Sequence, residues 1–136
     1  MNVIEEIRAN VEGARVLSDW LGDGVPVDVN QASRRALACL RGNDGEECPH
    51  HKAARWWDLW KNPIADAIKG QIALKSRMNL STPYDGQLKM CAPCGCSMPV
   101  KIWVPIEHVK AHTPEAVKAK FPPFCWQRKE LEMENK

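Results

Sequence analysis

The sequence has no hydrophobic run that approaches the ~18 apolar residues of a membrane-spanning helix, so we expect no transmembrane segment. Strong compositional bias is absent too. Of the 136 residues, 44% are hydrophobic and 26% are charged, which excludes a wholly disordered or collagen-like chain. Residues 1–6 are acidic and amphipathic, whereas a secretory signal starts basic and continues apolar. We therefore expect a cytoplasmic protein that has no membrane partner.

Familiar catalytic motifs are missing. The sequence contains no glycine-rich phosphate loop, no G-x-S-x-G and no H-E-x-x-H. No clear base accompanies any of the cysteines, so a cysteine nucleophile is not indicated. We expect a protein that is not an enzyme.

Charge of one sign does not dominate, because the net charge is only +2. Residues 1–68 hold eight basic against eleven acidic residues, a net −3, whereas residues 69–136 hold eleven against six, a net +5. This distribution favours a solvated, mildly basic surface on the second half. A nucleic-acid partner is the alternative interpretation.

Apolar spacing predicts a helical first half. Residues 3–21 form one expected helix, and a second covers residues 31–40 with Asn30 as its N-cap. A third is expected from about residue 52 to 78, with a restart at Asn62-Pro63. The expected buried positions of the first helix include Val11, Ala14, Leu17 and Leu21, and those of the third are Ile64, Ala67, Ile68, Ile72 and Leu74.

The second half has a different pattern. Val100, Ile102 and Val104 alternate with Lys101 and Trp103, which predicts a half-buried strand. A short strand is expected at 87–90, and short helices at 106–112 and from residue 113. The sequence therefore predicts an α+β protein with one shared core: a helical region at 1–80, a small zinc-knuckle-like, cysteine-rich region with short strands at 81–127, and a flexible tail at 128–136.

Cysteine is abundant, with six residues in the chain, and its spacing gives the strongest signal. Cys91 and Cys94, followed by glycine, match the Cys-x-x-Cys-Gly pattern of a zinc knuckle. Cys96 lies two residues further on, and Cys125 returns between Phe124 and Trp126. Such density in a cytoplasmic chain favours metal binding over disulfides. The first predicted ligand set is therefore Cys91, Cys94, Cys96 and Cys125.

Two kinds of cofactor fit four thiolates. Zinc suits a closed tetrahedral site and contributes ~10 kcal/mol or more to folding. An iron–sulfur cluster also takes four cysteines and is compatible with close spacing. The glycine after the second cysteine favours zinc.

A second group of metal-ligating residues comes earlier in the chain and consists of Cys39, Cys48, His50 and His51. The four could form a site of their own. Alternatively, Cys39 and Cys48 could join two of the later cysteines, which would leave the other two as spare thiols. A purely structural role is the third interpretation. His108 and His112 complete a finger-like C-x2-C-x13-H-x3-H pattern, but we interpret His108 as a packing residue.

Three tryptophans, Trp56, Trp57 and Trp60, lie close together in the third expected helix. Trp57 projects about 100° away from Trp56 around the helix axis, so one stripe cannot bury them all. We expect at least one indole to contact another protein or a second copy of the chain. A shared role in the core is the alternative.

Four segments together give the sequence a family resemblance: Thr82-Pro83-Tyr84-Asp85, the stretch from Cys91 to Lys101, Pro105-Ile106-Glu107-His108, and Phe124-Cys125-Trp126. In these segments the chain resembles small cysteine-rich proteins encoded by bacteriophages and prophages. That family also has an upstream cysteine pair after an Arg-Ala helix, matched here by Arg35, Ala36 and Cys39. Its second cysteine is usually close, whereas eight residues separate Cys39 from Cys48 here. The resemblance implies a viral context and a metal site, and no activity.

Taken with the resemblance, the sequence predicts a non-catalytic interaction protein with structural zinc, acting as a virion or assembly component of a phage. Its expected location is the host cytoplasm or the virion. A nucleic-acid-binding zinc module is the second hypothesis, and an iron–sulfur protein is the third.

Overall fold

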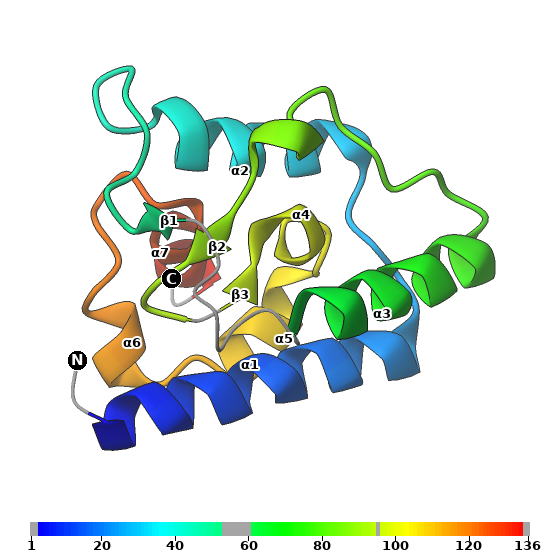
Figure 1. Cartoon of the computed structure of the whole chain (residues 1–136), viewed down its shortest axis with the longest axis horizontal. Helices are drawn as coiled ribbons and strands as arrows, with labels where there is room; N and C mark the ends of the chain where they lie inside the picture. Colours follow the sequence, from blue (N-terminus) through cyan, green and yellow to red (C-terminus); the bar gives the residue numbers. More distant parts are fainter. Residues whose placement is uncertain (1–2, 53–60, 95, 135–136) are drawn as a thin grey trace.

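The computed structural model describes residues 3–52, 61–94 and 96–134 and has the expected α+β architecture. Across those ranges it contains seven α-helices and one three-stranded antiparallel sheet. Helix α1 (Val3–Asp23) runs along one side of the molecule and α2 (Val29–Arg41) along the opposite side, with most later elements between them (Figure 1). No helix in the described ranges is both long and apolar enough to cross a membrane.

Helix α1 confirms the predicted helix, but the predictions for Val11, Ala14 and Leu21 are wrong, because these side chains are exposed. Val16 and Trp20 are fully buried instead, and Leu17 is partly buried against the core as predicted. The helix carries two overlapping apolar stripes, and the stripe with the tryptophan faces the core. Burial of one large indole outweighs burial of several smaller side chains.

Helix α2 is capped two residues before its predicted N-cap. The side chain of Asp28, not Asn30, caps it by accepting a hydrogen bond from the Gln31 backbone N–H at 2.7 Å. Ala32 and Ala36 are buried, as expected for this amphipathic helix. Arg35 lies on the same face of the helix and is also fully buried, which the sequence did not lead us to expect.

Helix α3 (Lys61–Ser76) includes the predicted restart, and residues 53–60 lie outside the described part of the chain. Ile72 is buried as predicted, together with Ala65. The predictions for Ile64 and Leu74 are wrong, because these side chains are 52% and 76% exposed. Ala67 is exposed as well, so α3 presents an apolar stripe to solvent.

The strand predicted at residues 100–104 is wrong. Residues Met98–Lys101 form the short helix α4, and the chain then turns through residues 102–104. Proline in the first turn of α4 preorganises a helix, since its fixed φ suits that position. All five side chains that seemed to alternate, including Lys101 and Trp103, are buried.

The sheet is small and connects both halves of the sequence. Its strands are β1 (His51–Lys52), β2 (Met90–Cys91) and β3 (Cys96–Ser97), in that order and all antiparallel. The register sets His51 opposite Cys91 and Cys91 opposite Cys96. The sheet therefore aligns residues from both predicted ligand groups in one row.

The C-terminal segment is ordered differently from the prediction. The short helices α5 (Ile106–Ala111) and α6 (Glu115–Lys118) occur near their expected positions, and a 3-10 turn spans Asp85–Gln87. Helix α7 (Trp126–Glu134) replaces most of the predicted flexible tail. Its Gln127, Glu130 and Leu131 lie at helical spacing on the inner face, where Gln127 and Leu131 are buried.

Two histidines, one in α5 and one directly after it, connect this helix to carboxylates of α1. His108 Nε2 lies 2.9 Å from Asp23 Oδ2, and His112 Nδ1 lies 3.0 Å from Glu12 Oε2. The second ring nitrogen of His112 contacts the carboxylate of Asp19. With both nitrogens held by carboxylates, His112 is unsuited to the zinc-finger role that its spacing suggested.

The contacts of His112 with these carboxylates predict that the stability of the protein depends on pH. Burial lowers the pKa of His112, but its hydrogen bonds to the carboxylates of Asp19 and Glu12 outweigh burial and raise it above 6.5. The stabilisation is therefore fully present below about pH 6.5 and is lost as the pH rises through the higher folded pKa. Thermal melts from about pH 6 to 9 should show this slope, and His112→Gln should remove it. An unchanged dependence of Tm on pH in the variant would contradict a stabilising role for these contacts.

Candidate metal centre

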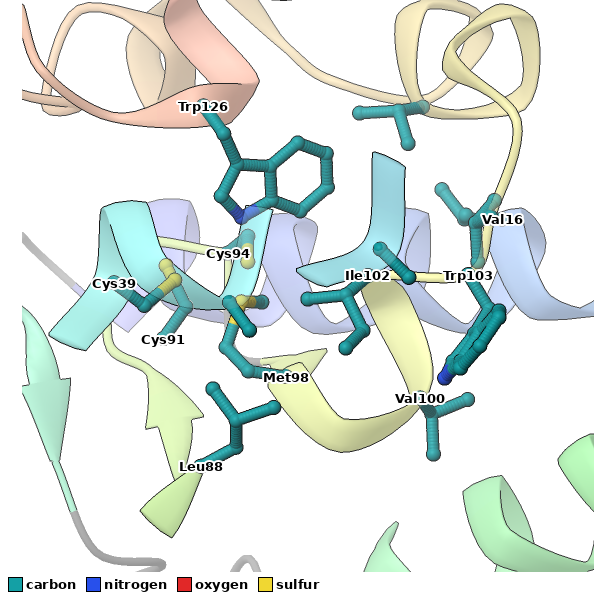
Figure 2. Packing of buried hydrophobic residues seen from close by; sticks show 14 of the residues in the cluster. Val16, Cys39, Leu88, Cys91, Cys94, Met98, Val100, Ile102, Trp103 and Trp126 are labelled. Atoms are coloured by element: carbon teal, nitrogen blue, oxygen red, sulfur yellow. The ribbon is translucent and has the colours of Figure 1, made fainter. Parts of the chain in front are cut away.

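All six cysteines are free thiols, and they come together from four separate segments. Cys39 lies near the end of α2, and Cys48 lies in the loop before β1. Cys91, Cys94 and Cys96 lie in the β2–β3 hairpin, whereas Cys125 directly precedes α7. Figure 2 shows the side chains of Cys39, Cys91 and Cys94 gathered beside the Trp126 indole. The fold therefore joins the two groups that are distant in the sequence.

A tight turn explains how the long spacer brings Cys48 back to Cys39. Asn43 and Glu46 exchange two backbone hydrogen bonds, of 3.2 and 2.9 Å, around the Asp44-Gly45 pair. Both central residues have positive φ, 51° and 87°, as expected for an Asp-Gly hairpin turn. The Cys48 N–H then donates to the Cys39 carbonyl oxygen at 2.8 Å.

Backbone N–H groups are directed at several of the sulfurs. Those of His50 and His51 favour the thiolate of Cys48, and those of Gln127 and Arg128 favour the thiolate of Cys125. In both places the donors come two and three residues after the cysteine. Amide donors at this position stabilise thiolate ligands in metal sites.

Cys94 is the centre of the cluster. The Cys96 thiol donates to the Cys94 carbonyl oxygen at 3.5 Å. The Cys94 thiol interacts electrostatically with Cys91 and Cys96, and also with Cys39 and Cys125. Cys39 and Cys125 are in turn neighbours of each other and of Cys48. Cys39, Cys48, Cys94 and Cys125 are thus linked by electrostatic interactions, and Cys91 and Cys96 interact with Cys94.

Burial keeps most of these thiols protonated in the absence of a cation. It is the main cause that raises the pKa of Cys39 to about 12 and the pKa of Cys125 to about 11. Burial also acts on Cys94, but hydrogen bonds from Cys91 and Cys96 and the charge of Lys101 outweigh it and lower the pKa of Cys94.

Three buried residues of the cluster were missed in the sequence. Lys101, only 3% exposed, has its ammonium group among the sulfurs of Cys94 and Cys96. Burial lowers the pKa of Lys101, but the thiolate charges outweigh this and raise it. The sequence did contain a signal for this buried charge, because Lys101 is a single cation within an apolar run. The alternation of residues 100–104 suggested instead that Lys101 faced solvent.

Trp126 and Gln127 supply further donors. The Gln127 amide Nε2 lies 3.8 Å from the sulfurs of both Cys91 and Cys94. The Trp126 indole N–H is near Cys39 but has no hydrogen-bond partner of normal geometry among the described residues. Buried donors without good acceptors are rare, and a thiolate would satisfy them better than a thiol.

The histidines of the second predicted group are placed differently from the cysteines. His51 Nδ1 lies 2.6 Å from Glu47 Oε1, and its Nε2 accepts the Lys89 backbone N–H at 2.6 Å. Neither nitrogen of His51 is therefore free for a metal in this arrangement. His50 contributes its carbonyl oxygen, which accepts the Ala92 N–H at 2.8 Å.

The cluster is not a preformed metal cage. Over the described ranges, no group of three or more His, Cys, Asp or Glu side chains is arranged so that it could hold a metal ion as it stands. Ligation would require the thiols to lose protons and turn toward a common point. The predicted protein-contact residues Trp56, Trp57 and Trp60 lie outside the described residues.

Comparison of the chain with protein-family models, curated proteins and solved structures gave no match. The site must therefore be interpreted from its own chemistry.

Proposed function

We propose that this chain is a non-catalytic interaction protein whose core is stabilised by one zinc ion bound to Cys39, Cys48, Cys94 and Cys125. The single observation that carries the proposal is the convergence of these four thiols from separate segments. It corresponds to the hypothesis in which the early cysteines join two of the later ones. His50 and His51 are left out of the ligand set, as are Cys91 and Cys96.

The donors around the sulfurs support this ligand set. Cys48 and Cys125 each have two backbone N–H groups directed at the sulfur, and Trp126 has an unsatisfied indole N–H near Cys39. Lys101 supplies a buried positive charge beside Cys94. A zinc ion with four thiolates carries a net charge of −2, so a buried cation offsets part of its cost.

The role of the metal would be to connect four segments that are distant from one another in the sequence. One ion would join the end of α2, the loop before β1, the β2–β3 hairpin and the start of α7. Its binding free energy would then be folding free energy. Such a centre is closed, with no open coordination position for a substrate.

Metal analysis tests the proposal. Protein purified under reducing conditions should contain one zinc per chain and should lack the visible absorbance of an iron–sulfur cluster. Brown protein with iron and sulfide would favour the iron–sulfur hypothesis. Protein without tightly bound metal would contradict the proposed centre. Salt-dependent binding to DNA or RNA would instead favour the nucleic-acid hypothesis.

The apolar stripe on α3 supports the interaction part of the proposal. Ile64 and Leu74 are two large exposed hydrophobic side chains on this helix, and Ala67 is exposed as well. A second copy of the chain is the simplest partner, because an isologous contact needs only this one face. In the viral setting that the resemblance implies, the contact would belong to a phage particle or its assembly.

Leu74→Gln should weaken self-association in sedimentation velocity while changing the free energy of unfolding by less than about 0.5 kcal/mol. The matched control on the same helix is Ile72→Ala, which should cost about 2–4 kcal/mol because Ile72 is fully buried. A chain that sediments as a monomer at all concentrations would exclude this face as a contact between copies.

A further inference from the structure

We propose that Cys91 and Cys96, the two thiols outside the proposed zinc ligand set, form a redox-modification site that closes as a reversible disulfide. The inference goes beyond the proposed function, and neither thiol belongs to the proposed zinc ligand set. It rests on the pairing of the β2–β3 hairpin and on the position of Lys101.

The hairpin sets the two cysteines directly opposite each other. Cys91 on β2 and Cys96 on β3 are cross-strand partners. The Met98 N–H donates to the Lys89 carbonyl oxygen, so in this register Cys91 and Cys96 are a hydrogen-bonded pair. The Cα atoms of such a pair are about 5.5 Å apart, and a disulfide needs about 4.4–6.8 Å. As cross-strand partners, the two side chains lie on the same face of the hairpin.

A second metal ion is a poor occupant for this part of the cluster. The ammonium group of Lys101 lies among these sulfurs and is 3% exposed, so it would repel a second cation in a dry environment. Among the described residues, no carboxylate or imidazole joins Cys91 and Cys96 to complete a ligand set. Covalent pairing needs neither a cation nor a further ligand.

The difference in burial between the two thiols indicates which of them reacts first. Cys96 is half-buried and Cys91 is buried, so Cys96 is the thiol that a small oxidant reaches first. With oxidised glutathione, the Cys96 sulfur forms a mixed disulfide and releases one glutathione. The Cys91 sulfur then attacks the Cys96 sulfur and releases the second glutathione. The chain loses two hydrogens and two electrons, and one glutathione disulfide is reduced to two thiols.

Differential alkylation tests the pairing in the full chain as purified. The protein is exposed to oxidised glutathione, then denatured in the presence of a chelator, alkylated with a first reagent, reduced, and alkylated with a second reagent. Trypsin releases residues 90–101, which contain all three hairpin cysteines. We expect the first reagent on Cys94 and the second reagent on Cys91 and Cys96.

A variant and the zinc content of the oxidised protein distinguish this inference from the metal proposal. Cys91→Ser should stop at the mixed disulfide on Cys96, because the second thiol is then missing. Oxidised wild-type protein should retain its zinc, because neither paired thiol is a proposed ligand. A Cys91–Cys94 pair, or three unoxidised cysteines, would overturn the inference. The expected pair in a chain without metal would overturn only the zinc proposal.

Discussion

Cys125→Ser should remove the metal and unfold most of the protein. The apparent binding free energy of structural zinc is about 10–16 kcal/mol, and at such a site it contributes to folding. Loss of even ~3 kcal/mol would lower Tm by roughly 10 °C in a chain of this size. Thermal unfolding followed by circular dichroism, together with zinc analysis of the same sample, would measure both effects.

Cys96→Ser is the matched control, since Cys96 lies in the same cluster but outside the proposed ligand set. We expect this variant to bind one zinc per chain and to melt close to the wild type. If Cys96→Ser loses its zinc while Cys125→Ser retains it, the ligand set proposed here is wrong. A ligand set centred on Cys91, Cys94 and Cys96, as predicted from their spacing, would then be favoured.

The second large effect is expected at Arg35, whose guanidinium is buried in the core. Its Nε and one terminal nitrogen bind the Glu130 carboxylate at 2.8 and 2.6 Å. The other terminal nitrogen donates to the carbonyl oxygens of Ile102 and Val104 at 3.0 and 2.7 Å. The guanidinium also lies 4.3 Å from the centre of the Trp126 ring. Arg35 therefore joins α2, α7 and the turn after α4.

Arg35→Ala should destabilise the protein by about 3–5 kcal/mol, because it leaves a hole and two carbonyl groups without their donor. Glu130→Gln should cost less, since the amide keeps one acceptor and the Glu130 side chain is partly exposed. Urea unfolding of both variants would measure the difference. A cost below about 1 kcal/mol for Arg35→Ala would contradict a central role for this side chain.

The existence of the helices was easier to predict than their orientation. Apolar spacing located α1, α2 and most of α3, since period-3.6 patterns are strong over many residues. It chose the wrong face of α1 because Val11 and Leu21 belong to one stripe, and Val16 and Trp20 to another. Only the tertiary packing decides which of two such stripes is buried.

The second half was harder because its segments are short. Residues 100–104 alternate in polarity, but Lys101 is buried against thiols instead of facing solvent. The charged composition of the C-terminal segment suggested a frayed tail. It is a helix because Glu130 pairs with the buried Arg35, a partner 95 residues away that local pattern cannot identify.

The sequence identified the cysteines as candidate metal ligands, but their spacing did not show which of them lie close together in the fold. The short spacing of Cys91, Cys94 and Cys96 favoured these three as one set. The Asp44-Gly45 turn and the β1–β2 pairing instead bring Cys48 and Cys39 into the same cluster. Such long-range proximity follows from the fold, and no short motif encodes it.

The most direct test of the proposed centre is X-ray absorption at the zinc edge of the purified, reduced protein. Ligation by Cys39, Cys48, Cys94 and Cys125 predicts a single shell of four sulfur atoms at about 2.3 Å. A shell that includes nitrogen or oxygen at about 2.0 Å would contradict an all-thiolate site. Absence of zinc from the protein would contradict the centre itself.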